Sequence, residues 1–175
     1  KPIKKNFPIK LLIIIKNEFL SIYNSQDDGE EFSLSPDSMG RRSLKNTALN
    51  YLSCSSKDGL DLAYAQFQSA SNMTDEISSF SQLVRYPNDH KEEAIKAFYD
   101  KWNHETLVMQ KWLGVLSSSP ADDTYERVLK LESDPIYDPT VPNLLRSLIG
   151  IFSRNAVHFH HESGRGYKLV RERIL

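Results

Sequence analysis

The stretch Pro142–Tyr167, PNLLRSLIGIFSRNAVHFHHESGRGY, decides the fold of this chain. Pro142 suits the first turn of a helix, because proline has no N–H to lose there. The second half, Ala156–Gly166, packs three histidines, a phenylalanine and two glycines into a loop. The helix is expected to belong to the hydrophobic core. The loop that follows it is either a connection of defined shape or a functional site. The helix is predicted because apolar residues recur at spacings that bring i, i+4 and i+8 onto one side: Leu144, Leu145, Leu148, Ile149, Ile151 and Phe152.

The rest of the chain repeats this pattern of short amphipathic segments, so eight or nine helices are expected. Prolines lie between the segments, and no alternation of apolar and polar residues predicts a sheet. A cap followed by proline is expected to start two helices, at Ser35-Pro36 and at Ser119-Pro120. Thr74 is expected to cap a further helix, and Asn88 or Asp89 is expected to start the one after it. Further predicted segments are helices at Ile9–Ser25, Leu60–Ala70 and Tyr167–Leu175, and an acidic, mobile loop at Gln26–Glu31.

Short helices joined by short turns imply antiparallel neighbours, each unable to bury its apolar face alone. The sequence therefore predicts an all-α fold of stacked antiparallel helix pairs, an ARM/HEAT-like right-handed superhelical array, with residues 1–175 as one helical domain. No clean internal repeat establishes a regular solenoid. The residues expected on the apolar faces include Leu44, Ala48, Leu49, Leu52, Leu62, Ala63, Phe67, Ala70, Phe98, Tyr99, Trp102, Leu107, Met109, Trp112, Leu113, Leu116 and Phe152.

The composition excludes several classes of protein. The 175 residues carry a formal net charge of −1 with both signs dispersed, which predicts no nucleic-acid or membrane partner. The apolar run Leu11–Ile15 is far shorter than the ~20 residues of a membrane span. The single cysteine, Cys54, allows no internal disulfide and fits a reducing compartment, cytoplasmic or organellar. Because the chain begins at Lys1 rather than methionine, we expect a piece of a longer protein.

The sequence lacks the motif of a zinc-peptidase helix, in which HExxH places two histidines one turn apart with a glutamate base. His104-Glu105 is followed by Val108 where the second histidine belongs, and His161-Glu162 is followed by Arg165. No catalytic, cofactor-binding or metal-ligating residue is assigned on this basis.

Weaker candidates each have a structural interpretation beside the functional one. His158, His160, His161 and Glu162 have the right donor types for a local metal site, but we favour a structural interpretation in which His160 packs or hydrogen-bonds within the loop and the others face water. Cys54 and Ser117–Ser119 have no neighbouring base in the sequence, so a plain thiol and helix-terminating serines are favoured. Asn72-Met73-Thr74 is interpreted as a helix entry rather than a glycosylation sequon. Arg41, Arg42 and Lys45 are interpreted as a solvated helix flank rather than a docking surface for an acidic partner.

Several motifs in order give the chain a resemblance to a known family. The opening stretch matches the pattern PN..RSLIG.F...N...FH..S/DG.GY, and three further segments match from Leu20 onward. The chain resembles the C-terminal helical domain of the aminopeptidase N family, the zinc-dependent alanyl aminopeptidases. The further segments are Leu20–Asn24 with Gly40–Asn46 and Tyr51-Leu52, then Ala65–Ala70 with Asn72–Asp75, then Phe98-Tyr99, Trp102, Met109 and Lys111-Trp112.

The resemblance implies a parent enzyme that removes N-terminal residues from peptides with one zinc, bound upstream of this piece. It implies a non-catalytic helical cap over the catalytic domain of the same polypeptide, with peptide substrates reached only through the parent. Val141 and Ser163 depart from the family's asparagine and aspartate, and the family's NPQxAxR segment is missing, so no substrate-binding residue is transferred. A cap cut from its partner is expected to self-associate. The alternative is a stand-alone HEAT-like protein-interaction scaffold.

Overall fold

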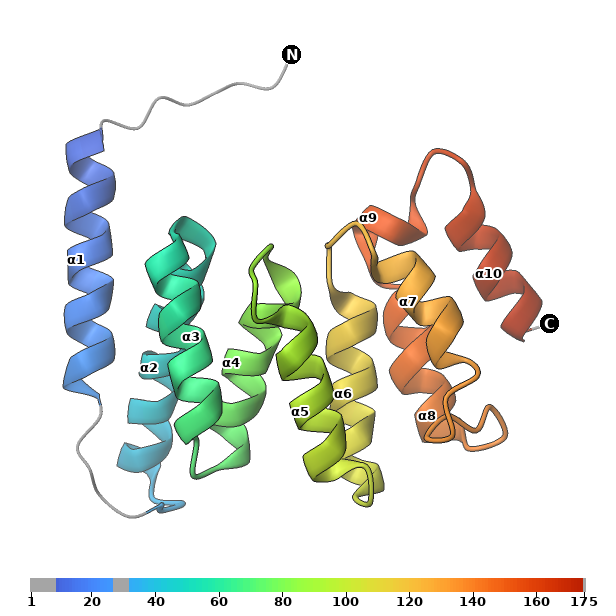
Figure 1. Ribbon diagram of the computed structural model, residues 1–175, viewed down its shortest axis with the longest axis horizontal. Helices are drawn as coiled ribbons and strands as arrows, with labels where there is room; N and C mark the ends of the chain where they lie inside the picture. The colour runs from blue at the N-terminus through green and yellow to red at the C-terminus, as the bar shows by residue number, and fades with distance from the viewer. Residues whose placement is uncertain (1–8, 27–31, 175) are drawn as a thin grey trace. The chain divides into compact units, whose positions relative to one another are not determined.

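The computed structural model describes residues 9–26 and 32–174, which form helices and no β-strand (Figure 1). The prediction of an all-α fold is therefore confirmed. All but Gln26 of the predicted loop Gln26–Glu31 lies outside the described residues. The helices are α1 Ile9–Ser25, α2 Pro36–Ser55, α3 Lys57–Ser69, α4 Met73–Arg85, α5 Lys91–Trp102, α6 Thr106–Ser118, α7 Thr124–Leu131, α8 Pro142–Leu145, the π-helical turn η1 Arg146–Gly150, α9 Ala156–Phe159 and α10 Arg165–Ile174.

The chain divides into two compact units, Lys1–Asn88 and Asp89–Leu175. In the first unit α1 packs on α2, α3 packs on α2 and α4, and α2 also contacts α4. In the second unit α6 lies at the centre, in contact with α5, α7, α8 and η1, while α9 packs on α10. Among the described residues, no helix has both the length and the apolar character that a membrane span requires. The assignment of residues 1–175 to a single domain stays a prediction.

Helices α2 and α3 meet at a tight corner around Ser56. Ser35 caps α2 and Pro36 occupies its first turn, as predicted. Ser56 ends α2 and caps α3, its hydroxyl accepting from the Gly59 N–H at 3.2 Å. A Cβ at Gly59 would lie 2.1 Å from the Leu52 carbonyl oxygen, so only glycine allows the two helices to approach this closely here.

Only some of the apolar side chains predicted to face inward in this unit are buried. Ala48, Leu49 and Leu52 are buried as predicted, whereas Leu44, expected beside them, is 46% exposed. Periodicity places Leu44 on the buried face, but the buried positions of α2 are concentrated near its C-terminal end, where α3 crosses. Ala63 is buried, and the other predicted inward residues of α3 are half-buried: Leu62, Phe67 and Ala70.

Two helix starts were predicted one or two residues away from where they occur. Asn72, not Thr74, caps α4, because its side-chain oxygen accepts from the Asp75 N–H at 3.0 Å. Helix α5 begins at Lys91 after His90, not at Asn88 or Asp89. The Asn88 amide is used elsewhere: it donates to the carbonyls of Leu83 and Tyr86 at the end of α4.

The predicted start of a helix at Ser119-Pro120 is wrong. The chain turns there, with the Ser119 hydroxyl accepting from the Ala121 N–H at 3.2 Å, and α7 begins only at Thr124. Asp123 occupies the cap position without a capping hydrogen bond, because its carboxylate binds Lys91 and Arg127 instead.

The stretch from Pro142 is helical, as predicted, but it is not one regular α-helix. Pro142 lies in the first turn of α8, and the π-helical turn η1 follows directly. A π-helical turn bonds i to i+5 and widens the helix locally. Most of the predicted apolar face survives this change: Leu144, Leu148, Ile149 and Phe152 are buried. The other two residues predicted for that face, Leu145 and Ile151, are half-buried.

The core of the second unit surrounds α6. Phe98, Met109, Trp112, Leu113 and Leu116 are buried as predicted. Tyr99 and Trp102 are half-buried, and Leu107 in the first turn of α6 is exposed, contrary to expectation. The other buried apolar residues of this unit are Ala94, Ile95, Val128, Leu131, Tyr137 and Leu169.

Candidate functional site

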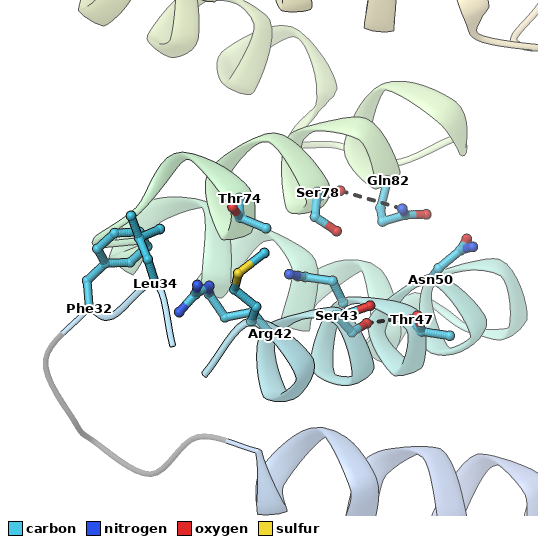
Figure 2. Close-up of a pocket in the computed structure, with 11 residues that line it drawn as sticks. Phe32, Leu34, Arg42, Ser43, Thr47, Asn50, Thr74, Ser78 and Gln82 are labelled. Atoms are coloured by element: carbon cyan, nitrogen blue, oxygen red, sulfur yellow. Dashed lines mark hydrogen bonds between the residues drawn. The ribbon is translucent and has the colours of Figure 1, made fainter. Parts of the chain in front are cut away.

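An open groove of about 530 Å³ lies between α2 and α4 in the first unit (Figure 2). Two rows of uncharged polar side chains line it, spaced by about one helical turn: Ser43, Thr47 and Asn50 on α2, and Thr74, Ser78 and Gln82 on α4. Both rows run in the same direction along the groove in Figure 2. Phe32, Leu34 and Met39 form an exposed apolar group at one end.

Arg42 is the charged residue that lines this groove. Its guanidinium carbon lies 4.7 Å from the centre of the Phe32 ring. Its two terminal nitrogens donate to the Ser38 hydroxyl at 2.6 Å and to the Ser33 carbonyl at 2.8 Å. These oxygens are neutral, so the contacts fix the guanidinium in place without cancelling its charge.

A buried polar network underlies the groove. Asp75 accepts from the Lys45 ammonium and from the Asn46 amide, each at 2.7 Å. Gln66 donates to the Asn46 side chain at 2.8 Å and to the Asp75 carbonyl at 3.0 Å. The Tyr23 hydroxyl donates to Gln66 at 3.0 Å. The network therefore connects α1, α2, α3 and α4 through their side chains.

The network explains two of the family motifs as structural. Lys45 and Asn46 end the motif that begins at Gly40, and Asp75 ends the Asn-Met-Thr-Asp motif. The interpretation of Lys45 as part of a solvated flank is wrong, because its side chain is 13% exposed and pairs with Asp75. Asn72 also donates to the Asp75 carboxylate at 3.3 Å, which fits the helix-entry interpretation of the sequon.

In the second unit, Asn155 and Ser117 join the end of α6 to the stretch from Pro142. The Asn155 amide donates to the carbonyls of Ser117 at 3.0 Å and Ser119 at 2.7 Å. Its oxygen accepts from the N–H groups of Val157 and His158, which caps α9. The Ser117 hydroxyl lies 3.1 Å from the Ser147 carbonyl oxygen inside η1. Ser117 thus ends a helix, as predicted, and also holds the neighbouring one.

The three histidines of the loop have separate partners. His160 hydrogen-bonds within the loop as predicted, but His158, predicted to face water, is buried. The His158 ring is buried, and its Nε2 donates to the Ala121 carbonyl at 2.9 Å. His160 bonds through Nδ1 to the Tyr167 hydroxyl, and His161 Nδ1 lies 2.8 Å from the Ser163 hydroxyl. Within residues 9–26 and 32–174, no three His, Cys, Asp or Glu side chains group as metal ligands.

Two positions of the same loop require glycine for steric reasons. Gly164 has φ +72°, in the left-handed region that favours glycine. A Cβ at Gly166 would lie 2.5 Å from the Phe159 carbonyl oxygen, so α10 starts in direct contact with α9. The Phe159 and Tyr167 rings then pack with centres 4.6 Å apart. Of the two interpretations left open for this loop, its contacts favour the shaped connection.

The remaining sequence candidates lie outside any reactive arrangement among the described residues. His104 and Glu105 are exposed, with His104 Nε2 and a Glu105 carboxylate oxygen 4.0 Å apart. Cys54 is exposed, and its thiol bonds to the Tyr51 carbonyl rather than to a base.

One charged cluster ties α5 to α7. The Asp123 carboxylate lies 2.6 Å from the Lys91 ammonium and 2.6 Å from a terminal nitrogen of Arg127, which also contacts Glu92. Partial burial alone would raise the pKa of Asp123, but the hydrogen bonds and charges of Lys91 and Arg127 outweigh it and lower that pKa to about 2. Because this cluster joins two helices of the second unit, we assign it a structural role.

Sequence reasoning missed the α2–α4 groove. A signal was present, because both rows of polar residues recur at intervals of three or four positions, which places each row on one helix face. The sequence does not indicate that α2 and α4, which are separated along the chain by α3, pack against each other.

Comparisons with known proteins agree with the motifs. The chain matches the family described as a domain of unknown function (DUF3458_C) with ARM repeats over residues 5–175. Aminopeptidase N of Caulobacter vibrioides is 36% identical over 147 residues, which cover 83% of this chain and 17% of that protein. Aminopeptidase N of Escherichia coli K12 is 32% identical over 162 residues, which cover 91% of this chain and 18% of that protein.

A solved structure shows the same fold. The crystal structure of Legionella pneumophila aminopeptidase A in complex with aspartic acid matches with a TM-score of 0.83 and 25% sequence identity. The match covers 94% of this chain and 20% of that one. The chain thus spans about a fifth or less of the length of these relatives. It belongs to the DUF3458_C family of ARM-repeat domains, the C-terminal helical domain of the aminopeptidases N that its motifs resemble.

Proposed function

We propose that this chain is a non-catalytic helical cap over the catalytic domain of a zinc-dependent aminopeptidase, within one polypeptide. The cap restricts the catalytic chamber to peptides with a free amino terminus. The observation that carries the proposal is the match of nearly the whole chain to less than a fifth of aminopeptidase N. The relatives therefore have most of their length outside the matched region, where a catalytic domain can lie.

The sequence supports the non-catalytic part of the proposal. A zinc peptidase of this kind needs HExxH, and neither His-Glu pair of the 175 residues continues to a second histidine. The zinc of the proposed parent enzyme is thus assigned to the catalytic domain. The three histidines of the loop, His158, His160 and His161, bond to carbonyl and hydroxyl groups of their own unit. A reducing compartment, cytoplasmic or organellar, and self-association of the isolated cap are parts of the same proposal.

The non-catalytic role is tested on the purified 175-residue chain. Incubation with zinc and an alanine-derived fluorogenic amide is expected to give no turnover, because the chain lacks the ligands and the glutamate base of that chemistry. Release of alanine that depends on added zinc and is abolished by a chelator would contradict the assignment.

A further inference from the structure

We propose that the groove between α2 and α4 binds an extended peptide segment through its main chain, with an apolar and an acidic side chain of that segment at the Phe32–Arg42 end. The proposal is independent of the capping role, because the binding is a property of the first unit and is measured on this chain alone.

The spacing of the two rows fits an extended backbone. Four residues of an α-helix rise about 6.0 Å, at 1.5 Å per residue. Two residues of an extended strand advance about 6.6 Å, and its N–H and C=O groups alternate at that interval. The hydroxyls of Thr74 and Ser78 on α4 therefore lie near the repeat of a peptide placed along the groove.

The side chains on these rows have hydrogen-bonding capacity to offer. Ser43, Asn50, Thr74 and Ser78 form no side-chain hydrogen bond with the described residues, and the Thr47 hydroxyl donates to the Ser43 carbonyl but still accepts. Hydroxyl and amide groups both donate and accept. A lining of such groups suits the alternating donors and acceptors of a main chain more than any one side chain.

A buried amide marks the far end of the groove. Gln82 is 7% exposed, and its side-chain oxygen has no hydrogen-bond partner among the described residues. Its nitrogen makes only a long bond to the Ser78 carbonyl, at 3.5 Å (Figure 2). Buried polar groups are normally satisfied. Because Gln82 lines the groove, a peptide N–H bound there is the candidate for the missing donor.

The opposite end sets the side-chain preference. Phe32, Leu34 and Met39 are each more than half exposed, which offers an apolar surface for one side chain of the ligand. Arg42 is held by neutral oxygens, and no carboxylate of the described residues pairs with it. Its charge favours an acidic neighbour of that apolar side chain.

The probe is a fluorescein-labelled octapeptide, blocked at both ends, with Leu-Glu followed by alternating Ala and Ser. Fluorescence anisotropy at chain concentrations that sedimentation shows to be monomeric is expected to give saturable, sub-millimolar binding for this sequence or for its reverse. The same peptide with N-methylated backbone nitrogens is expected to bind about tenfold more weakly, because each lost main-chain bond weakens the complex.

Variants of the chain locate the site. Asn50→Ala combined with Ser78→Ala is expected to weaken binding about tenfold, and Arg42→Gln to remove the preference for Glu over Gln in the probe. Asn17→Ala, an exposed asparagine on α1 outside the groove, is the matched control and is expected to bind as the parent chain does. Absence of binding, equal affinity for the N-methylated peptide, or equal affinity of the double variant and the control would each overturn the proposal.

Discussion

At the scale of single residues, the Lys45–Asp75 pair is a buried ion pair at the centre of the polar network of the first unit. The two side chains are 13% and 7% exposed, and their charged atoms lie 2.7 Å apart. Desolvation makes such a pair a weak source of net stability, but removal of one partner leaves the other charge buried and uncompensated. The same carboxylate also accepts from Asn46 on α2 and from Asn72 at the start of α4, so its loss affects both helices.

Asp75→Ala is therefore expected to lower the free energy of unfolding by about 3–5 kcal/mol, the usual effect of breaking a buried ion pair. Urea unfolding followed by circular dichroism measures the change. Asp58→Ala is the matched control: it breaks an ion pair of the same length with Lys16, but its carboxylate is 82% exposed and screened by water. Equal shifts of the two urea midpoints would show that the Asp75 network has no special structural role.

A second residue-scale prediction concerns Ser117 and the turn η1. Its buried hydroxyl lies against the Ser147 carbonyl oxygen at 3.1 Å and the Leu113 carbonyl oxygen at 2.5 Å. Ser117→Ala is expected to cost about 1–2 kcal/mol of unfolding free energy, because a buried bonding group is lost. Ser118→Ala removes an exposed hydroxyl bonded within α6 and is expected to change stability by less than about 0.5 kcal/mol. A thermal melt of each variant decides, and indistinguishable melting temperatures would refute the role of Ser117.

At the scale of elements, the cluster around Asp123 predicts how acid affects the contact between α5 and α7. The pKa of Asp123 is lowered from 3.8 to about 2 in the folded chain. Its carboxylate therefore stabilises the folded state above the unfolded pKa near 4, and this contribution is lost as the pH falls toward 2.

Asp123→Asn removes that contribution at every pH. The variant is expected to be less stable than the parent chain at pH 7 by about 1 kcal/mol, after a discount for the solvent screening of a half-exposed group. The difference should shrink as the pH falls from 4 toward 2. Urea unfolding at a series of pH values measures it, and a stability gap that stays constant down to the lowest accessible pH would contradict the assignment.

The elements also show what the sequence could predict and what it could not. Local chemistry placed Ser35-Pro36 and Pro142 correctly, because caps and prolines act within one turn of a helix. The start at Thr74 was wrong by two residues, because the side chain of Asn72 caps the Asp75 N–H instead. The start at Ser119-Pro120 was wrong where a partner distant in sequence, Asn155, binds the Ser119 carbonyl in the turn. Leu44 was misplaced because periodicity identifies a helix face but not the length over which a neighbour covers it.

The candidate site followed the same division. The absence of HExxH was accessible from the sequence, but the burial of His158 was not, because its partner, the Ala121 carbonyl, is distant in sequence. The groove was not, because it exists only where α2 and α4 pack across the turn of α3. The π-helical turn η1 could not be predicted either. The spacing of its apolar residues also fits an α-helix, so the pattern does not distinguish the two kinds of helix.

At the scale of the whole molecule, several residues of the family motifs serve to pack one helix against another. The Asn155–Ser117 contact, the Lys45–Asp75 pair and the close approach at Gly166 all lie in segments that match the family, and each joins helices within its own unit. A domain of this kind suits a cap, which needs a defined shape more than reactive groups. Exposed apolar side chains outside the groove, such as Leu107 and Val157, offer surface for contact with the rest of a larger polypeptide.

The central claim, that this domain limits access to an aminopeptidase chamber, is tested most directly on the parent enzyme with and without the segment that corresponds to this chain. The measurement is the ratio of two rates, hydrolysis of a small alanyl amide and removal of an N-terminal alanine from a folded protein. A cap predicts that deletion lowers this ratio by an order of magnitude or more, because the folded protein gains access. Retained activity on the small amide shows that the catalytic domain of the deletion form is intact. An unchanged ratio in such a form would contradict the account.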